Sequence, residues 1–177
     1  TLGYISRYAL GRDYHKVLRN RLKQLGERIE QRCQALLPST QETPGEWRPF
    51  VDSAPILERP LAAKAGLGWV GKHSLLLNES AGSFFFLGEL LIALPLPVDA
   101  PVEKELCGKC VACINICPTG AIIAPYVVDG RRCISYLTIE LKDDIPEELR
   151  SFMKDWIFGC DICQQVCPWN RFSLPSD

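Results

Sequence analysis

Eight of the nine cysteines in this chain stand at intervals that are typical of iron–sulfur ligands. The first run begins at Cys107 and reads C-x-x-C-x-x-C-x-x-x-C-P, and a second run from Cys160 reads C-x-x-C-x-x-x-C-P. In bacterial ferredoxins the first three thiolates of such a run bind one 4Fe–4S cluster, and the fourth binds the other cluster. The pattern predicts one cluster on Cys107, Cys110, Cys113 and Cys167, and a second on Cys117, Cys133, Cys160 and Cys163.

Two other uses of these cysteines compete with the clusters. Disulfides would suit an oxidising compartment, but nine is an odd number and the cysteines stand at metal-ligand intervals. Structural zinc usually takes two separated C-x-x-C pairs, and eight ligands would need two tetrahedral sites. Neither explains the doubled C-x-x-x-C-P ending. Cys133 is assigned by counting, because a long insertion separates it from Cys160, and Cys33 is left over as an inert buried thiol.

The composition describes a folded chain with one substantial core and a small appended module. It has 177 residues, is 47% hydrophobic and carries a net charge of -1. No apolar run approaches the ~20 residues of a membrane span. The balanced charge gives no overall footprint for nucleic acid, so such a partner would need a local patch. The chain begins in a loop and stops just after one, so we expect a fragment.

The first half must position any partner of the clusters. Residues 1–14 look like a loop, and apolar residues from His15 to Leu37 recur at helical spacing until Pro38 ends the helix. A loop is expected over 38–46. The polar face of the helix is either solvated or a contact for phosphate or RNA backbone, and it carries Lys16, Arg19, Lys23 and Arg28.

A short strand is predicted over residues 47–53, with Pro49 restricting it to an edge or a strand start. It delivers Asp52 just before a turn. A lone aspartate there is usually a cap or a turn former. The apolar residues around Asp52 would, however, disfavour its ionised form, as a general acid requires.

Glycines and apolar runs follow. Residues 60–65 read as a short helix with Pro60 at its first position, and 66–73 as a glycine-rich turn that allows close backbone approach. Residues 74–78 and 84–94 read as two strands of a hairpin, buried on both faces.

The second half carries the cysteines. Residues 95–106 read as a proline-rich linker, and 126–139 as a hairpin that turns at Asp129–Gly130. Residues 146–158 read as a helix with two glutamates in its first turn, closed by Gly159.

The chain resembles the epoxyqueuosine reductase family, the cobalamin-dependent enzymes of queuosine biosynthesis. The resemblance covers most of the chain, and its distinctive stretches are residues 6–16, 50–77, 107–118, 133–141 and 158–170. It implies that epoxyqueuosine is reduced to queuosine at the tRNA wobble position by cob(I)alamin that two 4Fe–4S clusters supply with electrons. Asp52 matches the family's proton donor. The matching segments also suggest cobalamin contacts at His15, Asp52, Arg59, Lys72, His73 and Ser135.

The resemblance also implies an organisation for the chain. We expect an α+β protein in which an incomplete corrinoid-binding domain of α/β type, residues 1–98, precedes a ferredoxin-like domain with both clusters, residues 99–172. Residues 173–177 would begin a C-terminal region. We expect a cytoplasmic monomer without a membrane partner, acting on tRNA that bears epoxyqueuosine and fed by an unidentified electron donor.

Two rival functions remain. A reductive dehalogenase shares the plan of a corrinoid and two clusters, but Asp52 in its VDSAP context and the CISYLTIE stretch favour the tRNA enzyme. A ferredoxin-type electron carrier is the alternative that is not an enzyme, and it would leave Asp52 and the glycine-rich turn without a role.

Overall fold

The long amphipathic helix forms where the apolar spacing predicts it. The computed structural model describes residues 2–36, 46–102 and 105–172, and in it α1 spans Tyr14–Leu36. The loop expected over 38–46 lies almost wholly outside these residues. Gly26 is the buried residue of α1, and the Trp47 indole packs against it. The contact requires glycine, because a Cβ there would lie 2.5 Å from the indole. The helix therefore packs on β2 through a glycine.

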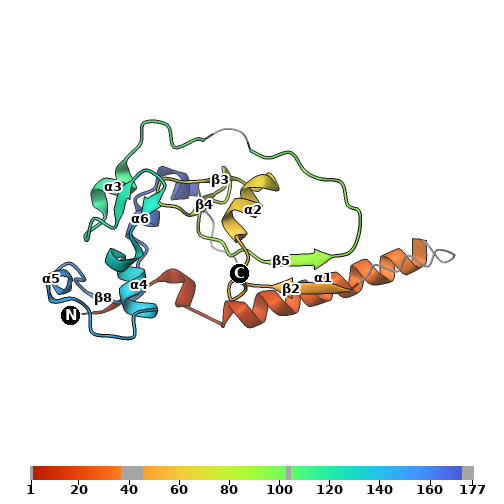
Figure 1. Ribbon diagram of the computed structural model, residues 1–177, viewed down its shortest axis with the longest axis horizontal. Coiled ribbons are helices and arrows are strands. Elements are labelled where there is room, and N and C mark those ends of the chain that lie inside the picture. The colour runs from red at the N-terminus through yellow and green to blue at the C-terminus, as the bar shows by residue number, and fades with distance from the viewer. Residues whose placement is uncertain (1, 37–45, 103–104, 173–177) are drawn as a thin grey trace.

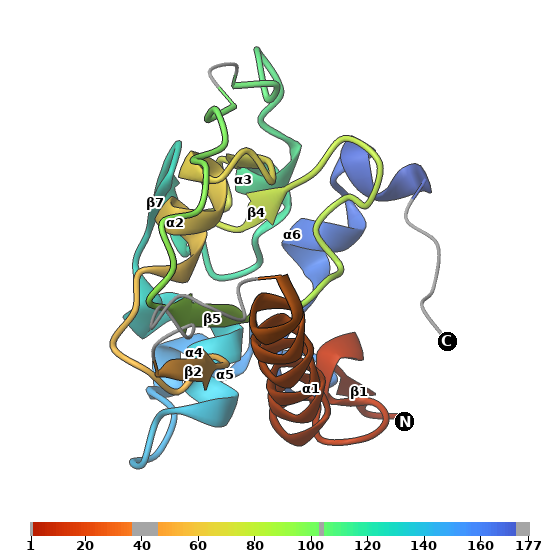
Figure 2. The ribbon, with the colours of Figure 1, turned by 90° about the vertical axis from the view of Figure 1, so that its right-hand side faces the viewer.

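Strand β2 (Trp47–Phe50) pairs antiparallel with β5 (Glu89–Ile92) beside α1, as Figures 1 and 2 show. Strand β4 (Leu76–Leu77) pairs instead with β3 (Trp69–Val70). The predicted hairpin between residues 74–78 and 84–94 is therefore wrong. The prediction that both strands are buried on both faces is also wrong. Leu76 and Leu77 are buried, whereas Leu91 is 53% exposed.

The glycine-rich turn explains this change of partner. A Cβ on Gly68 would lie 1.9 Å from the Leu77 carbonyl oxygen, so the two chains approach more closely than any side chain permits. Helix α2 (Glu58–Lys64) leads into this turn. Pro60 is its third residue and not its first, which the helix tolerates because the amides of the first turn have no partner within the helix.

The first residues are not the expected loop. Strand β1 (Tyr4–Ile5) runs parallel to β8 (Trp156–Phe158), and a 3₁₀ turn, η1 (Arg7–Ala9), follows it. Ser6 donates a hydrogen bond to the buried carboxylate of Asp161, which also accepts one from the Arg7 amide at 2.7 Å. The start of the chain is thus fastened beside the second cysteine run.

The cysteine-bearing half consists of short elements. In chain order they are α3 (Ala112–Ile116), β6 (Ile122–Ala124), β7 (Val127–Val128), η2 (Gly130–Arg132), α4 (Ile134–Ile139), α5 (Glu147–Arg150), β8, α6 (Ile162–Gln165) and η3 (Pro168–Phe172).

Two predictions for this half are wrong. Strand β7 pairs with β6, so the hairpin turns before residue 127, and Asp129 instead caps η2 by accepting a hydrogen bond from the Arg131 amide. The predicted helix over 146–158 stops after α5, because the chain turns to bring β8 alongside β1. Glu147 and Glu148 lie in the first turn of α5, as predicted.

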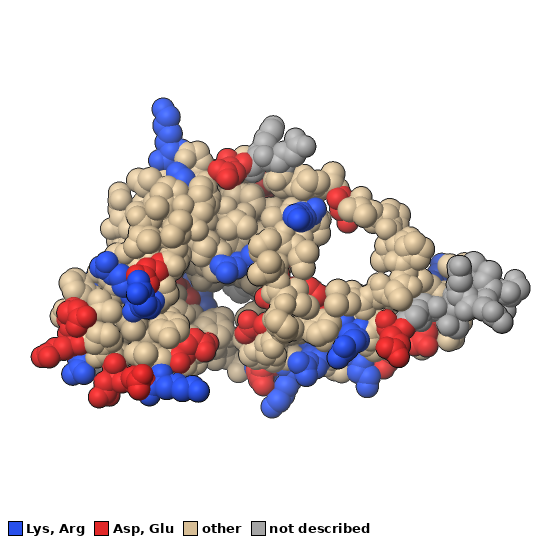
Figure 3. Space-filling view, in the orientation of Figure 1, with Lys and Arg blue, Asp and Glu red and all other residues tan. Residues whose placement is uncertain are grey.

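Charge is mixed over the surface, as the composition predicts. Figure 3 shows Lys and Arg interspersed with Asp and Glu on the face seen there. On α1, Lys16 lies 3.6 Å from Asp13, and Lys23 lies 3.9 Å from Glu27. These pairs favour a solvated face for the helix. Among the described residues no helix combines the length and apolar character needed to cross a bilayer.

The close contact at Gly68 generates a stability prediction. Gly68→Ala should lower the free energy of unfolding by about 1–3 kcal/mol, because the added methyl must push β3 and β4 apart. Urea unfolding followed by circular dichroism measures the change. Gly130→Ala is the matched control, since no atom of the described residues lies within 4 Å of its Cβ position. Equal stability of the two variants would contradict the reading of Gly68.

Candidate functional site

Four cysteines surround a cavity of about 250 Å³, here called the first cysteine cavity. They are the set predicted for one cluster: Cys107, Cys110, Cys113 and Cys167. Trp69, Leu77 and Cys167 form a buried core beside it. Burial raises the pKa of the Cys113 thiol, and the charges of Cys107 and Cys167 raise it further.

The other four cysteines surround a second cysteine cavity of about 330 Å³, namely Cys117, Cys133, Cys160 and Cys163. Burial raises the pKa of Cys160 to about 11 and that of Cys163 to about 12, and neighbouring thiols contribute. Thiols crowded in this way become thiolates together only when a cation compensates their charge. None of the nine cysteines, all within the described residues, forms a disulfide.

The four thiols of each cavity are spread around its walls and do not meet at a single position. Among the described residues no three His, Cys, Asp or Glu side chains come close enough to share a single metal ion. Four thiols around a volume suit a cluster, in which each thiolate binds its own iron.

Lys72 and His73 belong to these cavities. Lys72 is buried, with 9% of the residue exposed, and its ammonium donates hydrogen bonds to the carbonyls of Gly108 at 2.6 Å and Cys110 at 2.9 Å. It therefore holds the loop of the first cysteine run. His73 lines both cavities, and Ser135 on α4 lines the second. None of these three lies beside Asp52.

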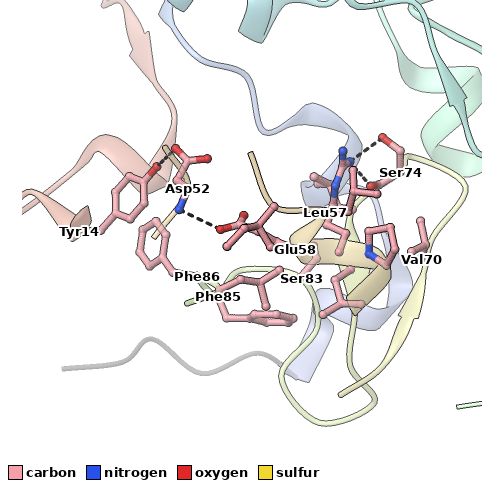
Figure 4. Close-up of a pocket in the computed structure, with 15 residues that line it drawn as sticks. Tyr14, Asp52, Leu57, Glu58, Val70, Ser74, Ser83, Phe85 and Phe86 are labelled. Atoms are coloured by element: carbon pink, nitrogen blue, oxygen red, sulfur yellow. Dashed lines mark hydrogen bonds between the residues drawn. The ribbon is translucent and has the colours of Figure 1, made fainter. Parts of the chain in front are cut away.

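Asp52 lies in a separate pocket of about 590 Å³, between α1, α2 and the segment that follows β4 (Figure 4). Leu57, Val70, Leu75 and Phe86 give it apolar walls. Arg59 reaches across from α2 and donates hydrogen bonds to the carbonyl and the hydroxyl of Ser74. Most of the pocket is apolar, with a few polar groups, as cofactor sites usually are.

The carboxylate of Asp52 is not in the apolar surroundings expected of it. Its side chain is 59% exposed, and its backbone φ is 55°, a left-handed conformation that aspartate tolerates better than most residues. Oδ2 accepts a hydrogen bond from the Tyr14 hydroxyl at 2.6 Å and lies 3.3 Å from Nε2 of His15. Polar contacts, and not burial, surround this carboxylate.

Tyr14, Glu58 and Glu89 were not singled out by the sequence. Burial raises the pKa of Tyr14, and so does its hydrogen bond to Asp52, so the phenol keeps its proton and donates. Glu58 Oε1 accepts a hydrogen bond from the Asp52 amide at 2.9 Å. These residues had one indication in the sequence, the position of Tyr14 next to His15. The approach of α1 to the turn at Asp52 is a tertiary contact, which local sequence patterns do not reveal.

The three cavities share one wall. Ser74 and Leu75 line the Asp52 pocket and the second cysteine cavity, while His73 lines both cysteine cavities. Ser74 has a φ of 64°, and this bend lets adjacent residues face different cavities. The Asp52 pocket therefore adjoins the second cysteine cavity, and that cavity adjoins the first.

Glu58 and Glu89 generate a pH prediction. Burial raises the pKa of Glu89 from 4.5 to about 7, and the Glu58 charge adds to it. The folded state therefore binds an extra proton between these pH values, so the free energy of unfolding should fall as pH rises from 4.5 to 7. In Glu89→Gln this fall should largely vanish in urea titrations, whereas the exposed Glu148→Gln should keep it. An unchanged pH profile in Glu89→Gln would contradict the assignment.

Two family models match this chain. Residues 106–170 match a 4Fe–4S double cluster binding domain, so this part of the α+β chain is an iron–sulfur domain. Residues 1–53 match the model described as epoxyqueuosine reductase QueG, DUF1730.

Relatives of known name agree. Epoxyqueuosine reductase of Escherichia coli is 72% identical over 97% of this chain and 43% of its own length. The structure of epoxyqueuosine reductase from Streptococcus thermophilus superposes with a TM-score of 0.87 at 36% identity, covering 99% of this chain and 45% of that one. An epoxyqueuosine reductase solved with an epoxyqueuosine-modified tRNA-Tyr stem loop gives 0.86 at 32% identity, covering 97% and 42%.

A catabolic reductive dehalogenase has a TM-score of 0.51 at 24% identity over 72% of this chain and 18% of its own, a likeness of fold alone. The chain spans a little under half the length of the curated relatives named epoxyqueuosine reductase. Three findings indicate the same family: the model that matches residues 1–53, the double cluster domain over 106–170, and the 72% identity over 97% of the chain. The chain belongs to the epoxyqueuosine reductase family.

Proposed function

We propose that this chain forms part of a tRNA epoxyqueuosine reductase, which reduces epoxyqueuosine to queuosine at the wobble position in the last step of queuosine biosynthesis. The single observation that carries the proposal is the row of three cavities joined through His73, Ser74 and Leu75. Two cavities offer four thiols each, and the third offers an apolar pocket with an acid at its edge.

The residues of the two cysteine cavities fit 4Fe–4S clusters. We assign Cys107, Cys110, Cys113 and Cys167 to one cluster, and Cys117, Cys133, Cys160 and Cys163 to the other. All-cysteine ligation and burial are compatible with low reduction potentials. Electrons would reach the Asp52 pocket from the second cluster, because only the second cavity shares walls with that pocket.

The Asp52 pocket fits one side of a large flat cofactor, and we assign it to cobalamin. Cobalamin would supply the low-potential nucleophilic centre that opens the epoxide. Asp52 and Arg59 line this pocket, His15 lies beside Asp52, and Ser135 lines the neighbouring cavity. Lys72 and His73, also proposed as contacts, have their polar groups at the cysteine cavities, which supports roles toward the clusters.

Asp52 is the proposed proton donor to the epoxide oxygen. Opening the ring leaves an alkoxide, which a carboxylic acid within hydrogen-bond reach neutralises. His15 can return the proton, because its Nε2 lies 3.3 Å from Asp52 and its Nδ1 3.1 Å from Asp13.

The remaining proposals concern context. We propose a catalytic domain over residues 1–98 and a ferredoxin-like domain over 99–172, although β1 and Ser6 contact the latter directly. Residues 173–177 lie outside the described part. The substrate would be epoxyqueuosine-bearing tRNA, met by a cytoplasmic monomer without a membrane partner, and the electron donor remains unidentified.

Anaerobic reconstitution with iron, sulfide and cobalamin tests the cofactor assignment. About eight irons per chain and a retained corrin spectrum are expected. Eight irons without corrin, repeated on a version with the full length of the relatives, would favour an electron carrier. Zinc in place of iron would contradict the proposal. Turnover of an organohalide instead of an epoxyqueuosine stem loop would identify a dehalogenase.

The acid role predicts the effect of Asp52→Asn. Asparagine also tolerates the left-handed backbone at this position, so clusters and corrin should be retained. Turnover of an epoxyqueuosine-bearing stem loop should fall at least ~100-fold, the usual contribution of a general acid. Asp99→Asn, in the exposed linker, is the control. Turnover within about tenfold of normal would remove Asp52 from this role.

The contacts of Lys72 predict the effect of Lys72→Met. Methionine has a similar length but cannot donate to the Gly108 and Cys110 carbonyls, so the first cluster should be lost to a chelator more quickly. Iron content should move from about eight toward about four per chain. Lys109→Met, exposed in the same loop, should retain all its iron. Equal rates of iron loss would show that Lys72 does not hold the loop.

A further inference from the structure

His73 lies in the wall between the two cysteine cavities. Its imidazole contributes to the lining of both, and only 4% of the residue is exposed. His73 lies in the reversal of the chain between β3 and β4. On one side of it Lys72 binds the first cysteine loop, and on the other Ser74 has the left-handed backbone that turns the chain toward β4. No other residue named in the lining of either cavity is shared by both.

The proton of His73 can be located from its hydrogen bonds. The Leu75 amide donates to Nδ1 at 3.2 Å, so this nitrogen carries a lone pair and not a proton. A neutral imidazole with an unprotonated Nδ1 carries its hydrogen on Nε2.

This Nε2–H has no partner among the described residues, although it is buried. A buried donor without an acceptor destabilises the folded state, and such groups are rare in folded proteins. The carboxylate that lines the second cavity together with His73, that of Asp161, already accepts hydrogen bonds from Ser6 and Arg7. The acceptors that the two cavities would provide are sulfur atoms, from thiolates and from cluster sulfide.

We infer that the Nε2–H of His73 donates a hydrogen bond to a sulfur of a bound 4Fe–4S cluster and raises the reduction potential of that cluster. The inference rests on the proposed occupancy of the cysteine cavities, and not on cobalamin or tRNA. Reduction adds negative charge to the cluster, so a donor to its sulfur stabilises the reduced form more than the oxidised form.

The position of His73 gives this bond a role in electron transfer. A ring placed between two clusters can donate to only one of them, so it separates their potentials. The cluster that receives the bond becomes the better electron acceptor of the pair. His73 would thereby determine which of the two clusters holds an electron before substrate binds in the Asp52 pocket.

Three variants of His73 separate the donor from the rest of the side chain. His73→Asn keeps an acceptor for the Leu75 amide, through the turn that asparagine forms with the backbone two residues on, but it has no donor at the Nε2 position. His73→Gln places an amide N–H near the Nε2 position and loses the Nδ1 acceptor. His73→Leu removes both. His15→Asn changes the only other histidine and is the control.

The measurement is a redox titration of the anaerobically reconstituted protein, without cobalamin or tRNA, followed by electron paramagnetic resonance. In His73→Asn and His73→Leu the reduction equilibrium constant of one cluster should fall about tenfold, which is ~59 mV for one electron. His73→Gln and His15→Asn should stay close to the unmodified protein. Iron analysis of each sample tests the clusters separately from the hydrogen bond.

Two outcomes would overturn the inference. Unchanged potentials in His73→Asn and His73→Leu, with iron retained, would show that no such bond exists. Equal shifts in all three variants would show that ring size or solvent access matters and the donor does not.

A second measurement on the unmodified residue decides the matter if the variants lose their clusters. In protein labelled with ¹⁵N-histidine and carrying His15→Asn, His73 is the sole labelled side chain. Pulsed electron paramagnetic resonance of the reduced clusters should then detect coupling to its nitrogen. Absence of that coupling would overturn the inference.

Discussion

The close approach between the glycine-rich turn and β4 is the constraint on which the rest of the site depends. Because Gly68 has no Cβ, the Leu77 carbonyl can lie against its backbone, and β3 and β4 form a tight antiparallel pair. The residues between these strands then have to reverse direction within a few positions. That reversal brings Lys72, His73 and Ser74 to three different cavities.

Long-range hydrogen bonds surround this reversal and connect the two halves of the chain. Asn170 binds the Ser83 amide at 2.6 Å, and Gln164 binds the Ser83 carbonyl at 3.0 Å. At the other side Ser6 and Arg7 bind Asp161, next to Cys160. The second cysteine run is therefore held from both sides by the first half, and Ser83 on one of these sides also lines the Asp52 pocket.

The titratable groups around Asp52 and the thiols of the cysteine cavities lie in different parts of the structure. The titratable groups around Asp52, including Tyr14, His15 and Glu58, lie on the exposed side of the pocket. The groups around the thiols, including His73, are buried, and burial keeps His73 neutral. The Asp52 carboxylate is therefore open to solvent, whereas the imidazole of His73, between the two sets of thiols, is shielded from it.

The sequence by itself predicted the long helix and the two sets of cysteines that line the two cavities, because both depend on spacing within short segments. Cysteine intervals reflect the geometry of a cluster, and the apolar period of α1 reflects the helical turn. Only the tertiary structure decided the partners of β4, β5 and β7, the exposure of Asp52 and the position of His73 between the cavities. These depend on contacts between distant segments, such as Gly68 with Leu77 and β1 with β8, for which local patterns carry no signal.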